Sequence, residues 1–272
     1  MRTWSAPAKI NLFLHVLGRR KDQLHQLQTV FQLLDYGDIL RFHVRGDGVI
    51  RRVGSNDGLP VEDLTIKAAR FLKETAGIGM GVDIELVKNI PIGAGLGGGS
   101  SNAATTLVAL NQLWGLNFGS EKLSGLGYEL GADIPVFIKG HSAYGEGTGA
   151  TLSSLDLPPR CYCIVVPPVQ VLTRDIYEDP QLTRDTPRRT IKSLMAGDTR
   201  NDLEPVTCQR YPVVGNSLQW LRSFGDARMT GSGSALFVEV LDEEQGREIL
   251  AKAPNGCVGF VANGVNHHPF KL

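Results

Sequence analysis

One segment of the sequence is well suited to hold a phosphate group: PIGAGLGGGSSNAATTL, at Pro91–Leu107. Five of the seven residues from Gly93 to Gly99 are glycine. Consecutive backbone N–H groups in such a loop form a concavity that binds anions, and the N-terminus of a following helix adds partial positive charge. A merely flexible entry to a helix would not need so many glycines, each of which carries an entropic cost. The candidate phosphate-binding residues are Pro91, Ile92, Gly93, Ala94, Gly95, Leu96, Gly97, Gly98, Gly99, Ser100 and Ser101, and the two serines can add hydroxyls to a phosphate or to phosphate-bound Mg²⁺.

Other phosphate-binding motifs fit this segment less well. A Walker A loop needs a lysine between its last glycine and the serine, and Gly99–Ser100 has none. Gly93-x-Gly95-x-x-Gly98 matches the dinucleotide-binding pattern, with Glu121 near the expected acidic position, so an NAD(P)-dependent oxidoreductase is an alternative. The oxidoreductase alternative is disfavoured because Pro91 separates the preceding strand from the glycine loop. The HRD and DFG motifs of protein kinases are absent from the sequence.

The elements that would position the loop can be read from the spacing of apolar residues. Alternation of apolar and polar residues predicts strands, and helical spacing predicts helices. In the first half we expect strands at Lys9–Leu17, Thr29–Leu34, Ile39–Val44 and Val82–Val87, and helices at Glu62–Thr75, Ser100–Trp114 (opened by two serines) and Glu121–Leu130. In the second half we expect strands at Tyr162–Val166, Ala235–Val240 and Val258–Ala262, and helices at Ser217–Phe224 and Glu243–Ala253.

A proline-containing stretch, Leu152–Arg160, is typical of a connection between domains. The pattern therefore predicts an α+β protein of two domains, at residues 1–153 and 154–272.

Composition argues against several classes of protein. The 272 residues include 28 Lys plus Arg and 28 Asp plus Glu, so the formal net charge is zero, which argues against a dedicated nucleic-acid-binding protein. No apolar run approaches the ~18 residues needed to cross a bilayer. The N-terminus lacks the apolar segment of a secretory signal, so we expect a cytoplasmic protein that binds neither nucleic acid nor membrane. The four cysteines lack metal-site spacing and have no accompanying histidines, so we expect buried, reduced thiols and no metal-ligating side chains.

Three segments together resemble a known superfamily. PAKINLFLHV (Pro7–Val16), PIGAGLGGGSSNAATTL and MTGSGSALFV (Met229–Val238) are similar, in order and separation, to the signature motifs of the GHMP small-molecule kinases. LHQLQTVFQLLDYGD, GADIPVF, GEGTG and NDLEP resemble the branch that acts on a cytidine diphosphate-linked methylerythritol. Homoserine or mevalonate kinases of the same superfamily are the alternative.

This resemblance implies a fold, cofactors and partners. The fold would be a ribosomal protein S5 domain 2-like N-terminal domain followed by a ferredoxin-like C-terminal domain, with the site between them. The reaction would be phosphoryl transfer from ATP, assisted by Mg²⁺, to an alcohol group of a small-molecule substrate. The resemblance leaves assembly as a homodimer open.

The resemblance also implies catalytic roles. Asp133 matches the catalytic base and Lys9 the catalytic lysine, acting together on the C2 hydroxyl of the substrate. Without the resemblance, Asp133 could be a carboxylate satisfied by backbone donors at a helix end. Lys9 could equally be a solvated lysine, because Ile10, Leu12 and Leu14 place the core on the opposite face of its strand.

Substrate recognition carries over less completely. Asn11, His25, Phe31 and Tyr177 match positions near the substrate, with His25 expected to hydrogen-bond the cytosine edge. The family has Asp-Gly-Tyr before that histidine, whereas this chain has Asp22-Gln23-Leu24 and so lacks a tyrosine that would stack on cytosine. Leu64 likewise replaces an asparagine on the adenine side. In the third motif, Thr230 and Ser232 are possible hydrogen-bond donors.

Overall fold

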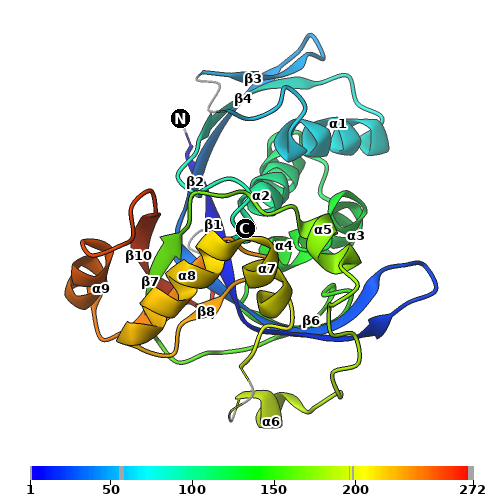
Figure 1. Cartoon of the computed structure of the whole chain (residues 1–272). Helices are drawn as coiled ribbons and strands as arrows, with labels where there is room; N and C mark the ends of the chain where they lie inside the picture. Colours follow the sequence, from blue (N-terminus) through cyan, green and yellow to red (C-terminus); the bar gives the residue numbers. More distant parts are fainter. Residues whose placement is uncertain (1, 55–57, 196, 198, 269–272) are drawn as a thin grey trace.

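A hairpin of two long strands, β1 (Trp4–Arg19) and β2 (His25–Arg45), runs through the computed structural model, which describes residues 2–54, 58–195, 197 and 199–268 (Figure 1). The sequence predicted two strands where β2 is continuous, because residues 35–38 have the composition of a turn. That prediction is wrong. Gly37 lies opposite Pro7, and a Cβ there would overlap the backbone of Ala6. The glycine therefore lets the two strands stay paired through the polar stretch.

Strand β2 organises the sheet because both of its edges are used. Along one edge it pairs with β1. Along the other it pairs in turn with β5 (Ala143–Gly147), β10 (Val258–Val265) and β4 (Gly81–Val87), all antiparallel. Two short strands, β3 (Ile50–Val53) and β6 (Thr151–Ser154), extend the sheet beyond β4 and β5.

Four helices lie together beside this N-terminal part of the sheet: α1 (Leu64–Ala76), α2 (Gly98–Leu113), α3 (Ser120–Leu130) and α4 (Ile134–Lys139) (Figure 1). Helix α2 is central, since it packs on β1 and β2 and also on α1 and α4. Helix α1 is capped at its N-terminus by Asp63, whose side chain accepts a hydrogen bond from the backbone N of Ile66, and at its C-terminus by Gly77 in the left-handed conformation.

The C-terminal part adds strands to the same sheet. β7 (Cys161–Val166) lies between β10 and β9 (Leu236–Val240), and β8 (Arg228–Met229) forms the edge. Helix α9 (Glu243–Leu250) packs on β7 and β10, and α8 (Pro212–Leu221) packs on β9. The remaining helices are α5 (Thr173–Glu178), α6 (Ile191–Met195), α7 (Glu204–Arg210) and a 3₁₀ turn at Arg222–Phe224.

The two parts share strands and core. β10 joins β2 through two residue pairs, Gly264 with Leu34 and Val265 with Leu33. Leu14 and Val16 of β1 are buried in the apolar cluster of the C-terminal part rather than in that of the N-terminal part. The α+β prediction is confirmed, while the boundary near residue 153 stays a prediction.

Three further expectations concern cysteines and membranes. Cys161 and Cys163 are buried on one face of β7, and burial raises the pKa of Cys163 to about 12. Cys208 and Cys257 are only partly buried, and all four thiols are free of disulfide bonds.

Within the described ranges, no helix has the length and apolar character needed to cross a membrane.

Candidate active site

The three motifs that are far apart in the sequence meet at one place. The backbone N of Lys9 in β1 donates to the Leu96 carbonyl oxygen of the glycine loop at 3.0 Å. The backbone N of Ala235 in the third motif donates to the Ala94 carbonyl oxygen, also at 3.0 Å. A Cβ on Gly95 would lie 2.6 Å from the carbonyl oxygen of Thr230. Because a glycine is needed for this close approach, the loop and the third motif form one packed unit.

The glycine loop connects β4 to α2 in an unusual backbone conformation. Gly93, Gly95 and Gly97 have φ of 69°, 76° and 72°, which side-chain-bearing residues rarely adopt. Helix α2 begins at Gly98, two residues before the predicted start, and its N-cap is Gly97. The serines therefore do not open the helix, because the close packing around Gly97 requires a glycine at the cap: a Cβ there would lie 2.9 Å from the Phe137 ring.

The two serines of the first helical turn differ in their surroundings. Ser100 is partly buried and lines the central cavity, whereas Ser101 is fully buried and does not. Within the described part of the chain, neither the hydroxyl of Ser101 nor Oδ1 of the buried Asn102 has a hydrogen-bond partner. Asn102 does line the cavity. Buried polar atoms are normally paired, so Asn102 is suited to a polar ligand at this helix end.

Lys9 and Asp133 form an ion pair, with Nζ and Oδ2 separated by 3.3 Å. The Lys9 side chain is 4% exposed and that of Asp133 is 36% exposed. Asp133 is the N-cap of α4, but its side chain makes no capping hydrogen bond. Neither of the alternative readings from sequence describes this pair: Lys9 is not solvated, and Asp133 is not used by the helix end.

Asn11 holds the lysine in place. Its Oδ1 accepts a 2.6 Å hydrogen bond from Lys9 Nζ, while its Nδ2 donates to Thr29 Oγ1 at 2.8 Å. The backbone N of Asn11 donates to Oγ1 of Thr230 at 2.8 Å. Thr230 is fully buried, so it positions β1, whereas Ser232 lines the cavity.

A cavity of about 930 Å³ runs past these groups. It is lined by Lys9, Asn11, His25, Phe31, Asp133, Tyr177 and every loop residue from Pro91 to Ser100. Of the residues predicted from sequence to form the site, Ser101 and Thr230 do not line the cavity. Phe31 is buried beneath it, with its ring centroid 5.6 Å from Lys9 Nζ.

His25 and Tyr177 lie together on the cavity wall. Their ring centroids are 4.9 Å apart at an interplanar angle of 32°. Arg184 Nε donates to His25 Nε2 at 3.2 Å, which leaves His25 Nδ1 as an N–H donor. Burial, followed by the charges of Arg184 and Arg19, lowers the pKa of His25, so the ring is neutral near pH 7. Burial of the phenol and the charge of Asp133 raise the pKa of Tyr177 above its usual range.

Arg184 is a residue that sequence reasoning missed. Besides His25, its guanidinium donates to the backbone carbonyl oxygens of Tyr177, Asp179 and Leu182. It therefore links both aromatic residues of this wall. Nothing in the local sequence around residue 184 marks it, because its bond to the site residue His25 joins distant segments of the chain.

The hairpin tip beside His25 carries the substitutions noted above. Gln23 has φ of 68°, in the left-handed region where the family pattern has glycine. Leu24 is 48% exposed and lines the cavity. Leu64, at the start of α1, also lines the cavity, close to Gly99.

Asp38 is a second residue that sequence reasoning did not assign to the site. Its fully buried carboxylate is ion-paired with Lys88 and accepts hydrogen bonds from the backbone N of Asn89 and of Ile90, each at 2.8 Å. Those residues lead directly into the glycine loop. The position of the loop is therefore fixed from β2.

Comparison with known proteins agrees with this geometry. Residues 63–141 match the model for the GHMP kinases N terminal domain, and residues 183–259 match that for the GHMP kinases C terminal. A protein named 4-diphosphocytidyl-2-C-methyl-D-erythritol kinase from Aromatoleum aromaticum is 49% identical over 98% of this chain and 94% of its own length. The chain belongs to this family of GHMP kinases.

A second relative and one solved structure support the same assignment, and a more distant structure shares the fold. A kinase of the same name from Alkalilimnicola ehrlichii is 50% identical over 97% of this chain and 91% of its own length. A crystal structure of a 4-(cytidine 5'-diphospho)-2C-methyl-D-erythritol kinase has a TM-score of 0.81 at 31% identity, covering 97% of this chain and all of that one. Homoserine kinase from Cytophaga hutchinsonii, at 18% identity and a TM-score of 0.70 with 98% and 94% covered, shares the fold.

Membership of the GHMP kinases confirms the two-domain fold and the kinase class that the three motifs implied. The GHMP kinase motif also explains the glycine loop, so the loop need not be a dinucleotide-binding site. In this GHMP kinase the strand before the loop, β4, pairs antiparallel with β2, which is not the parallel β-α-β arrangement of a dinucleotide-binding domain.

Proposed function

We propose that this GHMP kinase transfers the terminal phosphoryl group of ATP to the C2 hydroxyl of 4-diphosphocytidyl-2-C-methyl-D-erythritol, a step in isoprenoid precursor synthesis by the methylerythritol phosphate route. The observation that carries the proposal is the Lys9–Asp133 pair, which lies in one cavity with the glycine loop and the His25–Tyr177 wall. The names of the relatives support the choice of acceptor.

Asp133 is the group that receives the hydroxyl proton. Its carboxylate opens on the cavity and is not used by α4. Lys9 has three N–H donors, of which Asn11 and Asp133 take two in the described residues, so the third can contact a substrate oxygen. Phosphoryl transfer depends mainly on positioning and on neutralising charge, and this buried cation contributes to both.

The glycine loop binds the phosphates in this proposal. Its backbone and the N-terminus of α2 face the same cavity as Lys9, and both favour anions. The residues present also fit Mg²⁺, which prefers oxygen ligands and takes one or two carboxylates together with phosphates. The hydroxyl of Ser100, which lines the cavity, would hold the ion together with the phosphates, and when bound the ion would offset the charge that develops on them.

The cytosine end of the substrate lies against His25. The Nδ1–H of a neutral histidine can donate to an acceptor on the edge of a base. A base bonded edge-on in this way shares the plane of the imidazole, so the Tyr177 ring can cover both. Asn11 and Phe31 line the stretch of cavity that also holds Lys9, where the methylerythritol would lie.

The catalytic roles are tested by Asp133→Asn and Lys9→Ala. Each variant should lower kcat by roughly 10²–10⁴-fold, the usual contribution of a positioned acid–base group, while the Kd for ATP changes little. Asp185→Asn and Lys67→Ala remove one exposed charge of each sign and should leave kcat unchanged. Near-normal turnover in Asp133→Asn or Lys9→Ala removes that residue from the mechanism.

The acceptor is tested by ADP release with Mg-ATP and four alcohols: the cytidylyl substrate, homoserine, mevalonate and galactose. Turnover with the cytidylyl substrate alone supports the proposal. Turnover with another alcohol keeps the kinase chemistry and shows that the His25 wall does not select a base.

Two further parts of the proposal concern the setting of the enzyme. We expect it in the cytoplasm, as a monomer or a homodimer. Cell fractionation and analytical ultracentrifugation of the full chain measure these two properties directly.

A further inference from the structure

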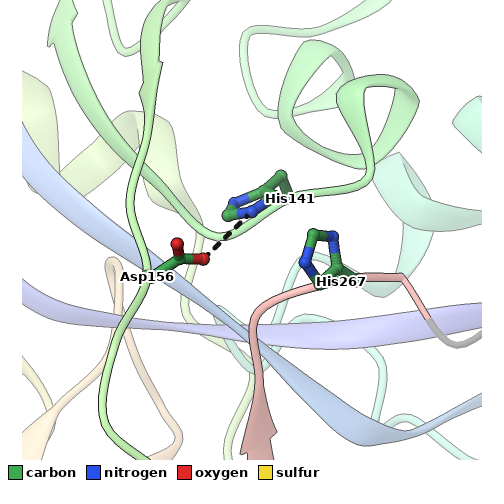
Figure 2. Close-up of side chains that lie close together, drawn as sticks. All are labelled: His141, Asp156 and His267. Atoms are coloured by element: carbon green, nitrogen blue, oxygen red, sulfur yellow. Dashed lines mark ion pairs between the residues drawn. The ribbon is translucent and has the colours of Figure 1, made fainter.

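Two histidines and an aspartate from three separate segments converge outside the cavity described above (Figure 2). His141 follows α4, Asp156 lies between β6 and β7, and His267 follows β10. One potential ligand atom from each residue lies within 4.8 Å of the other two. The sequence predicted no metal-ligating side chains, because these residues are widely separated along the chain.

The backbone around these three residues is firmly held. The backbone N of Ser142 donates to the Asn266 carbonyl oxygen at 2.8 Å, and the N of His268 donates to the Gly140 carbonyl oxygen at 2.8 Å. These bonds bracket His141 and His267. The neighbours of Asp156 are bonded into the same unit: the N of Leu155 donates to the Ser142 carbonyl oxygen, and Leu157 exchanges two hydrogen bonds with the Asn266 side chain.

The hydrogen bonding of His141 selects the form of the ring that binds metals. Its Nδ1 lies 2.8 Å from the backbone carbonyl oxygen of Ser142, and since a carbonyl can only accept, Nδ1 carries the hydrogen. In the neutral ring the lone pair is then on Nε2. A carbonyl partner of this kind is the usual outer contact of a metal-bound histidine.

Nε2 of His141 faces a carboxylate. It lies 3.3 Å from Oδ1 of Asp156, and the His267 ring is perpendicular to that of His141 with centroids 4.4 Å apart. A lone pair and a carboxylate oxygen at this distance need a cation between them, either a proton or a metal ion. The second imidazole adds another nitrogen donor to the same space.

We propose that His141, Asp156 and His267 bind a divalent transition-metal ion, with Zn²⁺ as the best match. Two imidazoles and one carboxylate suit Zn²⁺ better than Mg²⁺ or Ca²⁺, which prefer oxygen. Zn–N and Zn–O bonds of roughly 2.0–2.2 Å place tetrahedral ligand atoms a little over 3 Å apart. The 3.3 Å between His141 Nε2 and Asp156 Oδ1 already matches this spacing. The Asp156 side chain is 82% exposed, so it can move to complete the geometry. A water would complete the site.

The ion would connect parts of the chain that are distant in sequence. It would tie the segment after β10 to the end of α4 and to the connection between β6 and β7. Binding of the ion should therefore stabilise the folded chain. The inference does not depend on the acceptor proposed above, because none of the three side chains lines that cavity.

The test is calorimetric titration of the full chain with Zn²⁺ alone, after treatment with a chelator. We expect one site per chain and a Tm raised by roughly 5–10 °C when free Zn²⁺ is about 100 times its Kd. Co²⁺ should bind to the same three residues and show the visible absorption of a four-coordinate site.

Three variants identify the ligands. His267→Gln, His141→Gln and Asp156→Asn should each weaken Zn²⁺ binding by more than the roughly 10–100-fold lost when only an outer partner of a metal ligand is removed. His43→Gln is the matched control, because His43 is also exposed and lies on β2 away from this cluster.

Equal Zn²⁺ affinity in the wild type and in correctly folded His267→Gln, checked by circular dichroism, would overturn the proposal. So would the absence of saturable binding in the wild type. Because His267 is exposed and follows the last strand, its replacement should not prevent folding.

Discussion

At the scale of single residues, the structure shows how the hairpin tip adapts to the loss of a tyrosine. Leu24 occupies the position where the family pattern has the tyrosine, and it lines the cavity next to His25. A leucine supplies apolar contact but no aromatic face. Tyr177 lies against His25 from α5 and supplies one aromatic surface from elsewhere in the chain.

Leu24→Tyr should therefore lower the KM for the cytidylyl substrate. Base–aromatic stacking contributes roughly 1–3 kcal/mol per base, which corresponds to a KM about 5–150-fold lower. Initial-rate kinetics at saturating ATP measures the change, with Leu24→Met as the control for side-chain size. An unchanged KM in Leu24→Tyr would mean that residue 24 does not face the base.

His25 should give the folded protein a distinct dependence on pH. Its pKa is lowered in the folded state by burial and by Arg184 and Arg19, whereas in the unfolded chain it is near 6.5. As the pH falls below 6.5, the unfolded chain binds a proton that the folded chain does not, so the free energy of unfolding decreases. Stability from this source is present above pH 6.5 and is lost on acidification.

His25→Gln removes this titration and keeps an acceptor for Arg184. Between pH 7.5 and 5.5, the variant should lose less stability than the wild type in urea unfolding. The other histidines are common to both proteins and cancel in the comparison. Parallel pH dependences in the two proteins would contradict the lowered pKa.

At the scale of elements, the glycine loop is placed by the strands around it. Asp38 of β2 holds the two residues before the loop, and Lys9 of β1 and Ala235 of the third motif hold its middle. A loop with positive φ at three glycines has little intrinsic preference for one conformation. Its shape is therefore imposed by these contacts.

Asp38→Asn tests this dependence. The variant keeps an acceptor for the backbone N–H groups but leaves Lys88 buried without its counter-charge, so stability should fall by about 3–5 kcal/mol. The KM for ATP should rise because the loop is less firmly held. Glu243→Gln, which removes an exposed ion pair with Arg247, should cost less than about 1 kcal/mol. A similarly small loss in Asp38→Asn would show that the buried pair is not what holds the loop.

Sequence reasoning found most of the long elements and most of the site, for identifiable reasons. Apolar spacing marks α1, and α2 is rich in alanine and leucine; the predicted bounds of these two helices and of α3 and α9 are within a few residues of the observed ones. The break predicted in β2 was wrong because the polar residues there have partners on other segments instead of forming a turn: Asp38 accepts from the two residues before the glycine loop, and Asp35 accepts from Asn263. Arg184 and Asp38 were not assigned because their roles depend on contacts between distant segments.

At the scale of the whole molecule, the two parts of the chain are not independent. Val16 of β1 is fully buried among C-terminal residues, and β10 pairs with β2. The two parts should therefore unfold together, even though the connection near residue 153 has the composition of a linker.

Val16→Ala measures this coupling. Removing two buried methyl groups should cost about 2 kcal/mol. We expect a single calorimetric transition that shifts as a whole, because the residue comes from one part and packs in the other. Two transitions, of which only one moves, would instead indicate separately folding domains.

The contact between Gly95 and Thr230 has a consequence for anyone who recombines this enzyme with its relatives. A glycine loop from another kinase brings its own curvature and must fit against the carbonyl oxygen of residue 230 at a distance that leaves no room for a methyl group. Exchanging the loop alone would therefore create a mismatch that no rotamer change can relieve, since the obstructing atoms are backbone. Chimeras should succeed when the loop and residues 229–235 are inherited from the same parent.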